Sequence, residues 1–166
     1  MRRQRLLEAL QSAVEPLAGA YLAELFGVSR QVIVQDVALL RAEGHLIEST
    51  VRGYRLSRVS LGVRDAFGVL HGPDVTETEL NALVDLGITV IDVVVYHPIY
   101  GELRGGLDLQ SRRDVSQFMQ RLHEEETTLL STLTHGAHVH TVEARDRELL
   151  TAGRSALRQL GILNED

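Results

Sequence analysis

The chain has 166 residues, 44% of them apolar and 24% charged, a composition typical of one ordinary globular domain or two small ones. It contains no cysteine, which excludes disulfides and cysteine-ligated zinc, so any transition metal must be held by histidines and carboxylates. No apolar run approaches the length of a membrane span and the N-terminus lacks a signal-peptide pattern, so we expect a cytoplasmic protein without a membrane partner.

The net charge of −6 is unevenly distributed along the chain. Residues 1–55 hold seven arginines and six acidic residues, a net charge of +1, whereas the remaining ten arginines and 17 acidic residues give −7. This asymmetry suggests two modules with different partners. Nucleic acid, if bound, is expected to contact the N-terminal third.

Helical spacing of apolar residues predicts helices over 2–13, 17–26 and 30–43. Ser29 follows a tight turn and is a good N-cap for the third helix, which Gly44 ends. Residues 45–56 predict a β-hairpin with its turn at Arg52-Gly53. The apolar positions expected to pack the third helix are Val32, Val37, Leu39 and Leu40.

This helix–turn–helix with a hairpin wing carries residue types that reach base edges and phosphates in a major groove. The segments AELFGVSRQVIVQDVALLRAEG and STVRGYRL resemble the winged helix-turn-helix of bacterial transcription regulators. A helical module that binds another protein is the alternative. The resemblance implies a double-stranded DNA operator as partner, and the candidate contacts are Ser29, Arg30, Gln31, Gln35, Arg41 and Arg52.

A short polar segment, residues 57–60, is expected to join a DNA-binding domain, residues 1–57, to a second domain, residues 61–166. The second domain predicts the order β-α-β-β-α-β-α, with the short turn at 97–101 implying an antiparallel pair. This order is that of the ferredoxin-like split βαβ plan with one added helix, so the predicted fold class is α+β. The predicted elements are strands at 63–70, 88–96, 102–109 and 138–142, and helices at 76–86, 111–125 and 146–160.

Histidines and one glutamate of the second domain suggest a metal site. His138 and His140 are two residues apart on a predicted strand, so both rings face one side. His71 ends the first strand and Glu79 lies in the next helix. If the first and last strands are close, these four residues can converge on a divalent ion such as Zn, Ni, Fe or Mn. The alternatives are two exposed polar residues on a half-buried strand, and a capping box that Glu79 closes with Thr76.

Three further segments, LHGPDVTETELNALVDLG, VIDVVVYHPIYGEL and LSTLTHGAHVHTVEA, resemble the three-histidine (3H) domain. Over residues 2–160 the chain is similar to NiaR-type niacin-responsive repressors. The resemblance implies a homodimer that represses genes of NAD biosynthesis or niacin uptake, with nicotinic acid as corepressor at a divalent metal. By the same resemblance, the metal ligands would be His71, Glu79, His138 and His140, and the effector contacts His97 and Tyr100.

The sequence departs from that family in having only arginine as its basic residue and in its acidic second domain. A second hypothesis is a metal-dependent hydrolase, or another small-molecule enzyme, carrying a DNA-binding tether, with Asp74, Glu77 or Asp92 as base. No paired acid–base motif accompanies the ligands, so we expect that the protein is not an enzyme. A third hypothesis is a regulator without metal, whose histidines bind the effector directly.

Overall fold

The computed structural model describes residues 1–57 and 60–165. The chain divides into two compact units, Met1–Val59 and Ser60–Asp166. The predicted linker includes residues 58 and 59, and the predicted second domain includes residue 166; these three lie outside the described residues. Within the described ranges, no helix is long and apolar enough to cross a membrane.

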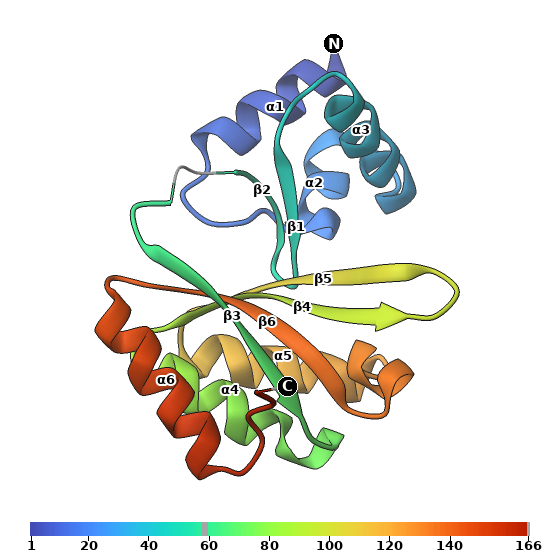
Figure 1. Cartoon of the computed structure of the whole chain (residues 1–166). Coiled ribbons are helices and arrows are strands. Elements are labelled where there is room, and N and C mark those ends of the chain that lie inside the picture. Colours follow the sequence, from blue (N-terminus) through green and yellow to red (C-terminus); the bar gives the residue numbers. More distant parts are fainter. Residues whose placement is uncertain (58–59, 166) are drawn as a thin grey trace. The chain divides into compact units, whose positions relative to one another are not determined.

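The first unit contains three helices and a two-stranded hairpin (Figure 1). Ser29 caps the third helix, because the Val32 amide donates to its hydroxyl at 3.3 Å, as predicted. The hairpin turn lies one residue earlier than predicted, since Gly53 already pairs with Thr50. The elements are α1 (Arg2–Ser12), α2 (Gly19–Phe26), α3 (Arg30–Ala42), β1 (Ile47–Thr50) and β2 (Gly53–Leu56).

The core of the first unit forms where the three helices meet the hairpin. Ile33 and Val37 are buried one helical turn apart on α3, whereas Leu39 is 44% exposed. The prediction that Leu39 packs inside was therefore wrong, because the buried stripe follows i, i+4 and i+7 spacing from Ile33 to Leu40. The buried cluster consists of Leu6, Leu10, Leu22, Ile33, Val37, Leu40 and Ile47.

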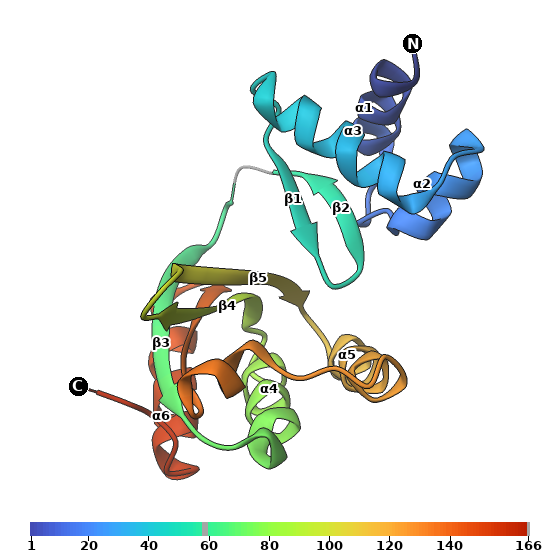
Figure 2. The same ribbon diagram turned by 90° about the vertical axis from the view of Figure 1, so that its right-hand side faces the viewer.

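The second unit has the predicted order β-α-β-β-α-β-α, and the predicted α+β class is confirmed. Helices α4, α5 and α6 lie on one face of a four-stranded sheet (Figure 1 and Figure 2). Two short 3-10 helices, η1 (Pro73–Val75) and η2 (Leu130–Thr134), were not predicted. The longer elements are β3 (Val63–Leu70), α4 (Thr76–Val84), β4 (Thr89–His97), β5 (Gly101–Leu109), α5 (Arg112–Glu124), β6 (Ala137–Ala144) and α6 (Arg147–Gln159).

The strand order departs from that of a ferredoxin-like sheet. The order is β3-β6-β4-β5, with every neighbouring pair antiparallel. Strands β3 and β4 thus run in the same direction with β6 between them, so the split βαβ connection is present. The central strands, however, are β6 and β4, whereas a ferredoxin-like sheet places its first and third strands in the centre. The expected neighbours, the first and last strands, are still adjacent, and this adjacency positions the histidines.

Candidate metal centre and nucleic-acid interface

Strand pairing brings the four predicted ligands together in the second unit. The β3–β6 register places Val69 opposite His138 and Phe67 opposite His140. His71 follows the end of β3 directly, and its amide donates to the carbonyl of Gly136 just before β6. Side chains alternate on β6, so His138 and His140 are buried and Val139 between them is 36% exposed. Glu79 reaches the same point from α4 and is 0% exposed.

The Nε2 atoms of the three histidines surround the Glu79 carboxylate. His71 Nε2 lies 2.7 Å and His138 Nε2 lies 3.6 Å from Oε2, while His140 Nε2 lies 3.3 Å from Oε1. One ligand atom each from His71, Glu79 and His138 falls within 4.8 Å of the others. The rings pack edge to face, with centroids 4.8 Å apart for His71 and His138 and 4.9 Å apart for His138 and His140.

Backbone carbonyls determine which nitrogen of each ring points into the site. Each Nδ1 lies 2.7–2.8 Å from a carbonyl oxygen, and because a carbonyl only accepts, Nδ1 must carry the hydrogen. In the neutral ring Nε2 then presents a lone pair. Three lone pairs and a carboxylate, all acceptors, converge and require shared protons or a cation. The carbonyls belong to Gly72 for His71, Gly136 for His138 and Asp92 for His140.

Glu79 is the residue whose surroundings best suit a bound cation. A fully buried carboxylate is costly unless it is paired. Its Oε1 receives no hydrogen bond from the described residues, although His140 Nε2 is close by. A tetrahedral ion with ligands at about 2.0–2.2 Å separates its ligand atoms by about 3.3–3.6 Å, which matches two of the three contacts. This donor set suits a borderline divalent ion such as Zn, Ni, Fe or Mn, although His140, which approaches Glu79 Oε1, lies outside the group of three residues whose ligand atoms all fall within 4.8 Å of one another.

Glu79 is available for this site because it does not cap its helix. Helix α4 begins at Thr76, and the N-cap residue Val75 makes no side-chain cap hydrogen bond. Among the described residues, the predicted capping box between Thr76 and Glu79 is therefore not formed. The hydroxyl of Thr76 is itself buried and has no partner among the described residues.

Burial and mutual charge act in opposite directions on this cluster. Burial alone would raise the pKa of Glu79, but the charge of His140 and the close ring nitrogens of His138 and His71 outweigh it and hold that pKa well below its ordinary range. Burial would lower the pKa of His71 and His140, yet the Glu79 carboxylate outweighs it and raises both. Without a metal, His71 and His140 therefore stay protonated to a higher pH than an ordinary histidine.

A small cavity of about 30 Å³ adjoins the histidines. Its wall is mainly apolar and comes from α4, β4, β5, α5, β6 and the segment around η2. No local pattern indicates this cavity, because six segments that are distant along the chain contribute one to three side chains each. The lining residues are Thr76, Leu80, Val93, Leu107, Phe118, Leu129, Leu130, Ser131, His138 and His140.

The predicted effector contacts His97 and Tyr100 lie at the β4–β5 turn and do not line this cavity. His97 Nδ1 accepts from the amides of Ile99 and Tyr100 at 3.1 and 3.2 Å. Its ring lies against that of Tyr100 with centroids 5.0 Å apart, and Tyr100 is 74% exposed. His97 therefore holds the turn together.

On the first unit, α3 presents a polar stripe to solvent. Arg30, Gln31 and Gln35 are exposed, and so is Val34 between the two glutamines, which the sequence reasoning missed. The spacing i, i+3 and i+4 from Gln31 is the signal that would have found it. A side chain of this kind can contact a thymine methyl group while its neighbours reach base edges.

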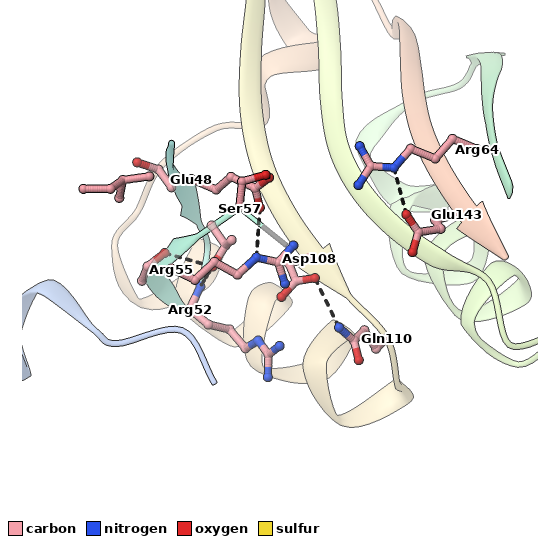
Figure 3. A network of polar contacts seen from close by, with 12 residues as sticks. Glu48, Arg52, Arg55, Ser57, Arg64, Asp108, Gln110 and Glu143 are labelled. Atoms are coloured by element: carbon pink, nitrogen blue, oxygen red, sulfur yellow. Dashed lines mark hydrogen bonds and ion pairs between the residues drawn. The ribbon is translucent and has the colours of Figure 1, made fainter. Parts of the chain in front are cut away.

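Several other arginines of the first unit are engaged within it. Arg41 donates through Nε to the Ile47 carbonyl and through Nη2 to the Ser49 hydroxyl, both at 2.8 Å, so it ties α3 to β1. Arg52 pairs with Glu15 at 2.8 Å. Glu48 accepts from Arg55 at 2.9 Å and from the Ser57 hydroxyl at 2.8 Å (Figure 3). The wing cations are thus partly neutralised.

Comparison with known proteins agrees with both halves of the chain. Residues 2–55 match the family model of an HTH domain and residues 64–166 match that of the 3H domain. The chain is 41% identical to the "Probable transcription repressor NiaR" of Thermotoga maritima and 39% identical to the "Transcription repressor NadR" of Bacillus subtilis. Each match covers 99% of this chain and 94% of the relative. The predicted resemblance is confirmed, and the chain belongs to the family of HTH–3H transcription repressors rather than to a family of enzymes.

Proposed function

We propose that this protein is a homodimeric transcription repressor that binds a double-stranded operator through α3 and uses nicotinic acid as corepressor. The effector is sensed at a divalent metal held by His71, Glu79, His138 and His140. The observation that carries the proposal is the convergence of three Nε2 lone pairs on a buried carboxylate beside a cavity. The relatives named as transcription repressors support the repressor role, and genes of NAD biosynthesis or niacin uptake are proposed as its targets from the family resemblance alone.

The chain's own residues prepare the metal site before any ion arrives. Three carbonyls fix the ring tautomers, and Glu79 supplies the negative charge that balances part of a divalent cation. Bound there, a metal would offer a Lewis-acidic position to the ring nitrogen of the effector. His138 and His140 belong to both the metal site and the cavity wall, so an effector in the cavity would lie against the ligands.

The cavity supports an aromatic acid as ligand. Nicotinic acid has a flat apolar ring, a ring nitrogen and a carboxylate, and the cavity offers a mainly apolar wall that also includes Thr76 and Ser131. A volume of about 30 Å³ holds about one or two waters, so the ring must displace lining side chains to enter. This displacement would link effector binding to a change in the second unit. The cavity is a better supported effector position than the turn of His97 and Tyr100.

The first unit supports operator binding by its geometry. Arg30, Gln31 and Gln35 are exposed on α3, where side chains reach the major groove in HTH proteins. A homodimer would present two such helices to half-sites about 34 Å apart. The weak positive charge of this unit predicts that operator binding relies on a few arginines.

Thermal unfolding of the purified protein with nicotinic acid, with nicotinamide and with neither, each with and without chelator, tests the proposal. Nicotinic acid should raise the melting temperature only when metal is present, and a ligand at about 100 times its Kd contributes about 2.7 kcal/mol. Stabilisation that persists in chelator would instead support a regulator without metal. No shift in any condition would contradict the metal-centred sensor and leave the DNA-binding half to be tested by operator titration.

A further inference from the structure

Strand β4 is irregular next to His140. Between Val90 and Val94 it advances four residues, while its partner β6 advances three, from Val142 to Val139. One extra residue on β4 is therefore bulged out of the ladder. Bulges of this kind re-aim backbone and side-chain groups and are common beside functional sites. The bulged segment contains Asp92.

Asp92 uses its backbone and its side chain on different partners. Its carbonyl oxygen lies 2.7 Å from His140 Nδ1. Its carboxylate Oδ1 accepts the backbone amide of Thr141 at 3.1 Å, and Oδ2 pairs with Arg104 from β5. The residue is buried, at 6% exposure. The carboxylate thus occupies the place where a regular β4 strand would offer a carbonyl to the Thr141 amide.

Because the Asp92 carboxylate accepts the Thr141 amide, the Asp92 carbonyl is free to accept a hydrogen bond from the His140 ring, even though it lies in the middle of a sheet. A β4 carbonyl turned toward His140 leaves a buried amide of β6 without its ladder partner, which would cost free energy. The carboxylate of the same residue satisfies that amide, and Arg104 holds the carboxylate in position. His140 is thereby held as the tautomer whose Nε2 faces Glu79.

We infer that Asp92 is a positioning residue for the metal site: its carboxylate sustains the β4 bulge that turns its carbonyl onto His140 Nδ1. The inference rests on the proposed function for its link to metal binding. Residues that hydrogen-bond a metal ligand in this way typically contribute about 10–100-fold to metal affinity. From the sequence, Asp92 was a candidate only for a catalytic base, a role that its contacts with Thr141 and Arg104 do not suit.

The test compares full-length wild type with Asp92→Ala, Asp92→Asn and the control Glu102→Ala. Glu102 is exposed and also pairs with Arg104, at 2.9 Å, but among the described residues it forms no hydrogen bond or ion pair with His140. The first readout is the tautomer of His140 in chelator-treated protein, from imidazole nitrogen NMR shifts followed to a pH at which the ring is neutral. The second is affinity for Zn²⁺ and Ni²⁺, measured by competition with a chromophoric chelator.

Asp92→Ala should weaken metal binding by about 10–100-fold. His140 should then no longer be fixed as the Nδ1–H tautomer and should populate the Nε2–H tautomer as well. Asp92→Asn keeps an oxygen acceptor for Thr141 and should restore most of both properties, and Glu102→Ala should resemble wild type. The inference is overturned if Asp92→Ala keeps the wild-type tautomer and an affinity within about twofold of wild type.

If Asp92→Ala does not fold, the asparagine variant decides, because loss of the tautomer in a folded Asp92→Asn protein would contradict the rescue. If wild type itself binds no metal, the proposed function fails, whereas the tautomer measurement still tests the role of Asp92.

Discussion

The imidazoles of the site are oriented by main-chain oxygens, and among the described residues Glu79 is the carboxylate in contact with all three. In the proposed site Glu79 therefore provides both the negative charge and the oxygen ligand, and it is fully buried. The histidines contribute neutral nitrogens whose direction is already set by Gly72, Gly136 and Asp92. Such preorganisation predicts that the charge of one side chain decides whether metal binds.

Replacing Glu79 by glutamine should abolish metal-dependent stabilisation. The amide keeps the size of the side chain but loses the negative charge, and its NH₂ group faces the ligand nitrogens. In thermal unfolding with added Ni²⁺ or Zn²⁺, wild type should show a rise that chelator reverses, and Glu79→Gln should show none. Glu77→Gln, on the exposed side of the same helix, is the matched control and should respond as wild type. An unchanged metal response in Glu79→Gln would remove this residue from the site.

The stability of the metal-free protein should fall as the pH rises. The pKa of His71 and of His140 is raised above the ordinary 6.5 by Glu79, so their paired charges stabilise the fold fully below that value. This stabilisation is lost as the pH rises through the raised values. The pKa of Glu79 is lowered, so its contribution is present above its ordinary 4.5 and is lost only as the pH falls through the lowered value.

Urea unfolding of chelator-treated protein between about pH 6 and pH 9 measures this dependence. The midpoint should decrease toward high pH in wild type and change less in Glu79→Gln. With metal present the trend should reverse, because metal binding needs neutral imidazoles and releases protons. A flat wild-type profile in chelator would show that the histidines are not paired with the carboxylate.

At the scale of elements, the turn before β6 joins two ligands. Gly136 has a φ of 96°, its carbonyl accepts His138 Nδ1, and a Cβ added to it would lie 2.3 Å from the His71 carbonyl oxygen. The turn and the end of β3 can therefore approach closely only with glycine at this position.

Gly136→Ala should displace the backbone of His71 and weaken metal binding by more than tenfold. The variant should also unfold more easily than a control in which only the backbone conformation is unfavourable. Gly161→Ala is that control, since Gly161 has a φ of 73° and open space around its Cβ position. The left-handed conformation costs about 1 kcal/mol in each, and the clash should add about 1–3 kcal/mol in Gly136→Ala alone. Equal losses in both variants would contradict the close approach.

The contacts of α3 separate its arginines into two roles. Arg30 is exposed at the start of the helix, whereas Arg41 is hydrogen-bonded to β1. Arg30→Ala should reduce the salt slope of operator binding by about one unit and leave the stability unchanged. Arg41→Ala should lower the free energy of unfolding by about 1 kcal/mol through loss of the wing contacts. Fluorescence anisotropy at several salt concentrations and urea unfolding distinguish the two, and an unchanged slope in Arg30→Ala would argue against a phosphate contact.

Gln35→Ala tests base recognition on the same helix. Its amide is expected to read a base edge, so the variant should lose about 1–3 kcal/mol of preference for the operator over unrelated DNA. Its salt slope should stay that of wild type, because no charge is removed. Equal loss on both DNAs would place Gln35 outside the recognition surface.

At the scale of the whole molecule, the proposal requires that two units influence each other. If metal and nicotinic acid together strengthen operator binding by some factor, the operator must strengthen nicotinic acid binding by the same factor. Titrating the metal-loaded protein with nicotinic acid, with and without saturating operator, should give this equality, with a factor of about 5–150. Affinities that do not change would show that the second unit does not control the first.

The local sequence pattern was sufficient to predict much of the secondary structure. The Ser29 cap, the strand at Val63–Leu70 and the helix that Asp146 caps were predicted because periodicity and cap chemistry act over a few residues. The four candidate ligands were also nominated from the sequence, since alternation on a strand places His138 and His140 on one face. Within the third helix, Leu39 was expected to be buried but is exposed, because the face of the helix that packs on the core is decided by the tertiary structure.

The sequence by itself determined the two-module organisation, the α+β class and the types of side chain available to hold a metal. Only the tertiary structure decided the strand order, the tautomers of the histidines, the cavity and the bulge at Asp92. The physical reason is that each of these depends on which distant backbone groups become neighbours. Asp92 and His140 are separated by 48 residues, and no periodicity in the sequence records that a carbonyl of one meets the ring of the other.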